Sequence, residues 1–310
     1  MMLGNIYSLK GRYEDAERTL KTAIEYLSPR DREEPTWIYS DLAGVYAKQG
    51  QYDRALEMMK LASRGRMHNS AVEFNLGEIY RMMGDLEKAA EYFKKSLAID
   101  RKNVKALEQL GLVLQQRQNW DESNRWYIAL SKLTPNSATV HLNIGRNYMM
   151  LREFPRAIPA LERSLALSPD NPRALEFLGN AYLSMTKTSK GMEYLEEAAR
   201  LAPDDAGIRA SYGNALFAAG QKTRSYDELH AALDIDPNNA RALMGMGILA
   251  SDQGRADIAR VSFTRILQLE PENVKAMVSL GILAFNENKR EEAIHWLKKR
   301  SNASRTIRPP

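Results

Sequence analysis

The sequence predicts an all-α fold, a solenoid of stacked helical hairpins. Three observations support this prediction. A glycine recurs every 34 residues from Gly77 to Gly281, with Ala43 one step further upstream. When this glycine is numbered position 8 of a repeat, position 20 is always Ala, Ser or Gly, and positions 7 and 24 are always large and apolar. A fixed period in this range is typical of units that cannot bury their apolar faces alone and therefore stack on their neighbours.

Each repeat is expected to contain two helices joined by a tight turn. Apolar residues at spacings of three and four predict amphipathic helices over positions 2 to 14 and 18 to 31. Position 15 is glycine in several repeats, for example Gly50 and Gly220, and this residue permits the left-handed conformation that ends a helix. Proline at position 32, as in Pro169 and Pro203, ends the second helix. The small residues at positions 8 and 20 are expected where the two helices cross closely.

Together with tyrosine or leucine at position 11, these positions give a pattern that resembles the tetratricopeptide repeat family over essentially the whole chain. The resemblance implies a right-handed superhelical solenoid of about nine antiparallel helix-turn-helix repeats. Members of this family usually bind other proteins.

The repeat register also predicts the organisation of the chain. Residues 1–30 form a first repeat that lacks its opening turn, and residues 31–35 are an inserted loop. Residues 36–307 form repeats two to nine in unbroken register, and residues 301–310 are expected to be a disordered basic tail. The incomplete first repeat and the lack of a polar capping helix suggest a fragment of a longer chain.

The charge distribution argues against nucleic acid as the partner. The chain has a formal net charge of +5, and the segment from Lys289 onward supplies this excess, so the rest is neutral. Binding to phosphates along a solenoid requires Lys and Arg clustered on one face, and no such stripe is present in the sequence.

The sequence predicts no catalytic residue, no cofactor site and no metal site. It has no cysteine, and its four histidines never pair at metal-ligand spacing. Gly245, Gly247 and Ala250 match a dinucleotide-binding fingerprint, but they lie within one expected helix and lack the preceding strand that this motif needs. No signal peptide or membrane-spanning segment is evident, so a cytoplasmic location is the default expectation, although a targeting segment upstream of Met1 would change it.

Function is therefore expected on the inner groove, which positions 2, 5, 9, 12 and 13 line in the family. Asn180 and Asn214 occupy position 9 of neighbouring repeats, and an asparagine amide can both donate to and accept from a peptide backbone. The candidates for binding a peptide are Arg146, Met149, Met150, Arg173, Glu176, Asn180, Asn214 and Phe217. The last two repeats contribute an apolar set, for groove binding or for self-association, made up of Met244, Ile248, Val278, Ile282 and Phe285.

The predicted function is a protein interaction scaffold that binds a segment of a partner. The family's carboxylate clamp for chaperone tails is not expected, because position 5 is never lysine. Two alternatives stay open. The array could be the substrate-recruiting part of a larger enzyme such as a glycosyltransferase, or it could be a structural array that forms homo-oligomers through its terminal repeats.

Overall fold

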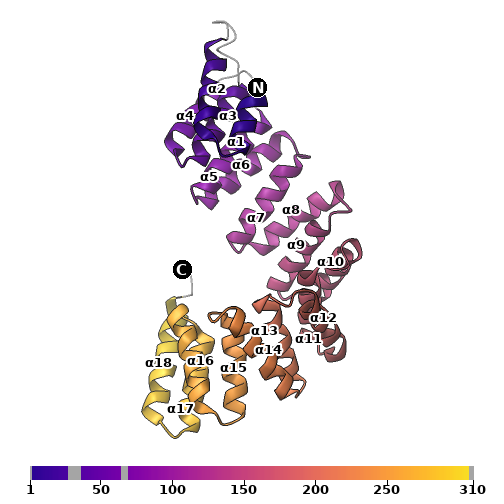
Figure 1. Cartoon of the computed structure of the whole chain (residues 1–310), viewed down its shortest axis with the longest axis vertical. Helices are drawn as coiled ribbons and strands as arrows, with labels where there is room; N and C mark the ends of the chain where they lie inside the picture. Colours follow the sequence, from indigo (N-terminus) through magenta and orange to yellow (C-terminus); the bar gives the residue numbers. More distant parts are fainter. Residues whose placement is uncertain (1, 27–35, 64–68, 307–310) are drawn as a thin grey trace. The chain divides into compact units, whose positions relative to one another are not determined.

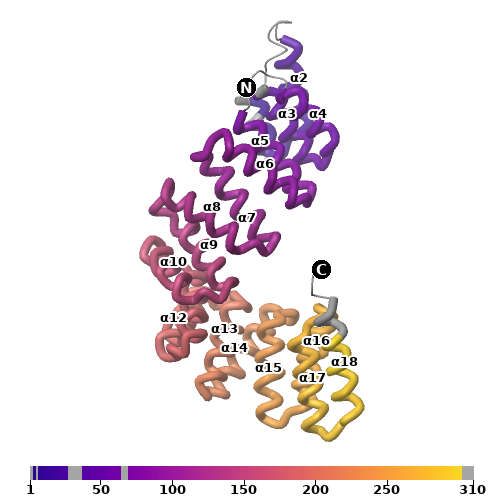
Figure 2. Tube along the Cα trace, turned by 180° about the vertical axis from the view of Figure 1, so that it is seen from behind, coloured from indigo at the N-terminus to yellow at the C-terminus, as the bar shows by residue number. Residues whose placement is uncertain are grey.

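The computed structural model describes residues 2–26, 36–63 and 69–306, and in these ranges the chain forms eighteen α-helices and no strand (Figure 1). Within each of two compact units, successive helices pack against one another. Figure 2 shows the same succession from behind. The predicted all-α repeat solenoid is therefore confirmed.

The chain divides into two compact units, Met1–Arg152 and Glu153–Pro310. The helices of unit 1 are α1 (Met2–Leu9), α2 (Tyr13–Glu25), α3 (Thr36–Lys48), α4 (Tyr52–Ala62), α5 (Ser70–Met82), α6 (Leu86–Ile99), α7 (Val104–Gln116), α8 (Trp120–Leu133) and α9 (Ala138–Met150). The helices of unit 2 are α10 (Phe154–Leu167), α11 (Pro172–Ser184), α12 (Thr188–Leu201), α13 (Ala206–Ala218), α14 (Lys222–Ile235), α15 (Ala240–Asp252), α16 (Ala256–Leu269), α17 (Val274–Asn286) and α18 (Arg290–Thr306).

The helices keep the predicted register with a shift of one residue. From α3 onward, each first helix of a repeat occupies positions 1 to 13 where positions 2 to 14 are predicted, and most second helices occupy positions 17 to 30. The N-caps explain the early start of the first helices. Asn171, for example, accepts hydrogen bonds from the backbone N–H groups of Arg173 and Ala174, at 3.1 and 3.2 Å. Such a cap satisfies donors that the first turn leaves free, so the helix begins directly after it.

The turn at position 15 adopts the predicted left-handed conformation. Gly50 and Gly220 have φ of 75° and 78°. The same conformation occurs where the repeat has no glycine, for example at Gln118 and Thr186, with φ of 57° and 61°. Here the hairpin geometry imposes a conformation that is unfavourable for a residue with a Cβ atom.

The two helices of a hairpin cross where the sequence has small residues. A Cβ atom added at Gly179 would lie 2.6 Å from Cγ of Leu195 and 2.9 Å from the carbonyl oxygen of Gly191, which are positions 24 and 20 of the same repeat. Where position 20 is serine, its hydroxyl bonds to the facing backbone, and Ser225 donates to the carbonyl of Gly213 at 2.8 Å. The close crossing at positions 8 and 20 is thus confirmed in these repeats.

Two predictions concern segments at or beyond the described ranges. The tail was expected to be disordered from Ser301, whereas α18 extends as far as Thr306. Helical hydrogen bonding simply continues past Arg300, since no proline or glycine occurs before Pro309. The inserted loop at 31–35 and residues 307–310 lie outside the described residues. Continuous stacking of repeats two to nine across both units stays a prediction.

Candidate protein-binding face

The first helices of unit 2 form one layer. Helix α11 contacts α13, α13 contacts α15, and α15 contacts α17, whereas the second helices pack against the first helices of their own and the next repeat. We call the exposed side of α11, α13, α15 and α17 the first-helix face. It presents the same repeat positions from successive helices, so a segment lying along it meets a regular row of side chains.

A polar pocket of about 460 Å³ lies on this face and brings the two predicted asparagines together. Asn180 of α11 and Asn214 of α13 line it, with Ser211 and with Arg241 of α15. Asn180 and Asn214 are both partly exposed. Two amide side chains and a guanidinium therefore converge on one opening.

Glu176 was expected to contact a ligand directly, but it lies beneath this surface. The residue is only 2% exposed, and both of its carboxylate oxygens accept hydrogen bonds. Oε1 accepts from the Ser211 hydroxyl at 2.8 Å and from Nη1 of Arg241 at 2.5 Å, and Oε2 accepts from Nη1 of Arg173 at 2.9 Å. Arg173 also pairs with Asp205 at 2.6 Å. A buried carboxylate needs such partners, and here it fixes two arginines that reach the surface.

Arg241 was not among the predicted site residues. Its side chain is half-exposed, at 52%, and Nη1 bonds to Glu176, to the Ser211 hydroxyl and to the carbonyl oxygen of Gly207. All three contacts use Nη1, and within the described residues none is formed by Nη2 or Nε, which can therefore donate to a ligand. Arg241 is at position 2, as is Arg173, so the family's groove positions could have identified it.

The other central candidates are placed differently. Phe217 is half-buried and packs against the core cluster that contains Ala210, Leu229 and Met246, so much of its side chain contacts the hydrophobic core. Arg146, Met149 and Met150 lie on α9 in unit 1, where Met150 is 53% exposed, and their joint action with the residues of unit 2 stays a prediction.

The apolar set lies on α15 and α17 at the end of the first-helix face. Ile248, Ile282 and Phe285 are 42%, 56% and 69% exposed, whereas Met244 and Val278 are half-buried. A small pocket of about 190 Å³ is lined by Ile248, Ile282 and neighbours including Ser251 and Ser279. Large apolar side chains exposed side by side favour contact with another molecule.

The described ranges also lack the features of a metal site and of a membrane span. No group of three or more His, Asp or Glu residues there could hold a metal ion. None of the described helices combines the length and the apolar character that crossing a bilayer requires.

Family models described as "Tetratricopeptide repeat" match residues 1–68, 70–103, 108–172, 142–184, 172–205 and 244–304. The chain belongs to the tetratricopeptide repeat family. The resemblance predicted from the 34-residue period is thereby confirmed.

Parts of the chain are also similar to curated proteins and to solved structures. The chain is 30% identical over 138 residues to a BBSome complex member BBS4 homolog from Drosophila melanogaster, covering 44% of this chain and 28% of that protein. It is 27% identical over 180 residues to human protein O-mannosyl-transferase TMTC1, covering 54% of this chain and 19% of the relative. A tetratricopeptide repeat protein from Parabacteroides merdae shares the fold, with a TM-score of 0.67 and 17% identity over 80% of this chain and 98% of that one. The chain thus spans less than a third of each of these two curated relatives.

Proposed function

We propose that this protein is a non-catalytic interaction scaffold and that the first-helix face of unit 2 binds an extended segment of a partner protein. The observation that carries the proposal is the polar pocket, where Asn180, Asn214 and Arg241 converge above a buried carboxylate. The BBS4 homolog is named as a BBSome complex member, which supports a role in protein assembly.

The chemistry of the pocket suits an extended peptide. A peptide in this conformation carries unpaired N–H and C=O groups, and each asparagine amide can pair with one of either kind. Each net hydrogen bond contributes about 1 kcal/mol. The free donors of Arg241 suit a carboxylate, and Glu176 holds the guanidinium in place before binding, which lowers the entropic cost of ordering it.

The experiment is affinity capture from lysate of the source organism with two variants. One carries Asn180→Ala, Asn214→Ala and Arg241→Gln, and the control carries Arg200→Gln, which removes an arginine 66% exposed on α12. Circular dichroism checks that both variants fold. We expect the control to keep the partners of the wild type and the triple variant to lose them. Capture of the same partners by both variants would move the binding site away from this pocket.

A second candidate function is substrate recruitment within a larger enzyme, and the similarity to the O-mannosyl-transferase favours it. In that case the pocket binds the acceptor protein on which the enzyme acts. Sequencing the flanking DNA tests this alternative, because a transferase domain in the same reading frame would support it and a stop codon on both sides would exclude it.

Self-association is a third candidate, favoured by the exposure of Ile282 and Phe285. It predicts a mass that rises with concentration in sedimentation velocity and that returns to the monomer value in the variant Ile282→Ser, Phe285→Ser. A wild type that stays monomeric at high concentration would exclude it. A cytoplasmic location stays a prediction.

A further inference from the structure

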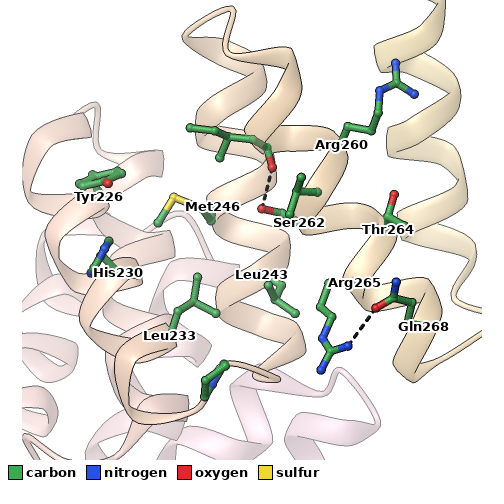
Figure 3. A pocket seen from close by; sticks show the side chains of 13 residues that line it. Tyr226, His230, Leu233, Leu243, Met246, Arg260, Ser262, Thr264, Arg265 and Gln268 are labelled. Carbon is green, nitrogen blue, oxygen red and sulfur yellow. Dashed lines mark hydrogen bonds between the residues drawn. The ribbon is translucent and has the colours of Figure 1, made fainter.

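The second helices of unit 2 carry another surface, an apolar trough between α14 and α16. It is a pocket of about 680 Å³ whose floor is formed by Leu243 and Met246 of α15 (Figure 3). Leu233 of α14 and Ile258 and Val261 of α16 supply apolar walls. Val261 is 70% exposed, the highest value for a large apolar residue on a second helix of unit 2 among the described side chains.

The corresponding troughs of the neighbouring repeats are crossed by charged bridges. Between α12 and α14, Arg224 pairs with Glu196 at 2.9 Å and donates to the Tyr212 hydroxyl at 2.6 Å. Nearby, Arg209 of α13 pairs with Glu228 of α14 at 2.7 Å. These side chains lie across the space between the second helices.

Two other troughs of unit 2 are also crossed by bridges between charged and polar side chains. Between α10 and α12, Lys190 donates to the Tyr182 hydroxyl at 2.8 Å, and that hydroxyl donates to Glu162 at 2.9 Å. Between α16 and α18, Arg260 pairs directly with Glu292. In each case a charged residue at position 19 of the later repeat completes the bridge.

The trough between α14 and α16 lacks this bridge because position 19 is Ile258. The residues that correspond to Arg209, Glu196 and Tyr212 of the closed trough are Leu243, His230 and Met246. Within the described residues, no ion pair or side-chain hydrogen bond joins α14 to α16. These four replacements, with Ile258, Leu243, His230 and Met246 in place of charged or hydroxyl-bearing residues, leave this trough open and mostly apolar.

Charge marks one end of the trough. Arg265 donates to the side-chain oxygens of Asn238 and Gln268, which are both neutral, and no described carboxylate forms an ion pair with it. Arg260, the other arginine that lines the trough, pairs with Glu287 and Glu292, and the His230 ring contacts Asp234 at 3.0 Å. An apolar occupant with an acidic group at one end is complementary to this surface.

We propose that this trough binds an amphipathic α-helix of a partner protein that carries an acidic side chain opposite Arg265. A helix satisfies its own backbone hydrogen bonds, whereas an extended segment would bury unpaired N–H and C=O groups against apolar walls. The α16 wall from Ile258 to Gln268 is about 15 Å long, which matches about three helical turns. The occupant presents apolar residues at spacings i, i+3, i+4 and i+7. This interface is separate from the first-helix face, and it distinguishes α14 and α16 from the other second helices of unit 2.

The test uses a displayed library of 14-residue peptides with apolar residues fixed at i, i+3, i+4 and i+7 and with Ala, Gln, Glu or Lys elsewhere. The library is selected on the full chain, and the enriched peptides are synthesised for titration. Two variants block the trough. Val261→Glu adds a carboxylate at an exposed position of the wall. The double variant Ile258→Arg with His230→Glu places across this trough the same bridge that Arg224 and Glu196 form across the neighbouring one. The control is Ile99→Glu, at a residue 44% exposed at the end of α6 in unit 1.

We expect the enriched peptides to be helical when bound and to carry Glu near one end. Their affinity should fall at least tenfold with either blocking variant and stay unchanged with Ile99→Glu. Arg265→Gln should lower the affinity of the Glu-bearing peptide about fivefold and leave that of its Gln counterpart unchanged.

Equal affinity for wild type and Val261→Glu overturns the proposal, even if the double variant fails to fold. A peptide whose Glu shows no coupling to Arg265 overturns the assigned charge complementarity. If the wild type instead dimerises and Val261→Glu makes it monomeric, the occupant is a second copy of this chain and the proposal is wrong.

Discussion

Replacing single glycines by alanine should have opposite effects at two equivalent positions of the repeat. Gly179 and Gly281 both occupy position 8, in α11 and α17. Alanine is favoured over glycine in a helix by about 1 kcal/mol. At Gly281 the new Cβ atom would lie 3.6 Å from its nearest neighbour, Cβ of Trp296, which is an ordinary van der Waals contact. Gly281→Ala should therefore raise the free energy of unfolding by about 1 kcal/mol.

At Gly179 the same substitution meets an obstacle. Its Cβ atom would lie 2.6 Å from Cγ of Leu195, and 2.9 Å from the backbone carbonyl oxygen of Gly191, which cannot rotate away. Overpacking of this kind costs about 1 to 3 kcal/mol, so it outweighs the gain in helix propensity. The net change should be a loss of about 1 kcal/mol.

Urea unfolding followed by circular dichroism measures both changes, and hydrogen exchange of the α11 and α17 amides separates local from global effects, because repeats can unfold in part. If Gly179→Ala stabilised the protein as much as Gly281→Ala, the close crossing of α11 and α12 would be refuted.

Three further predictions follow from individual residues. Burial is the main cause that raises the pKa of Tyr212 to about 12, and the hydrogen bond and charge of Glu196 add to it. The folded state therefore favours the protonated hydroxyl. The stability that this hydroxyl contributes is complete below pH 10, the ordinary pKa of tyrosine, and is lost as the pH rises from 10 through 12. The stability difference between wild type and Tyr212→Phe should therefore shift by about 1 to 3 kcal/mol over that window, and a constant difference would disprove the shift. Glu176→Gln should lower the free energy of unfolding by about 1 to 3 kcal/mol, because it removes the charge that pairs with two arginines, and unchanged urea unfolding would contradict this network. Thr186→Gly should raise the melting temperature, because glycine removes the steric cost of the left-handed conformation at this position. After the larger entropy loss of glycine is subtracted, the net gain in the free energy of unfolding should be about 1 kcal/mol. A lower melting temperature would contradict this prediction.

The sequence predicted the hairpins well because their determinants are local and repeat nine times. Gly179, Gly191 and Leu195 interlock as the spacing indicated, and from α3 onward the bounds of the first helices differ from the expected ones by a single residue. The left-handed turn at Thr186 was not indicated by residue type, because the closure of the hairpin, and not the local preference of threonine, sets its conformation.

The candidate site was predicted only in part. Asn180 and Asn214, which share position 9 of neighbouring repeats, line one pocket because equivalent positions of stacked repeats lie side by side. The burial of Glu176 and the orientation of Arg241 depend on contacts between α11, α13 and α15, which a periodic pattern does not specify. The trough between α14 and α16 was not predicted from the sequence. Its only mark there is a departure from the repeat pattern, since position 19 is Ile258 where the other repeats have a charged residue.

The central claim is that a partner lies along the first-helix face of unit 2. A photo-crosslinking residue at Ala218, which lines the polar pocket, tests it most directly against the same residue at position 200 on α12. We predict that a partner segment is crosslinked from position 218, that this product disappears with Asn180→Ala, Asn214→Ala and Arg241→Gln, and that position 200 gives none. Partners that bind normally but crosslink only from position 200, or from position 218 regardless of the three substitutions, would contradict it.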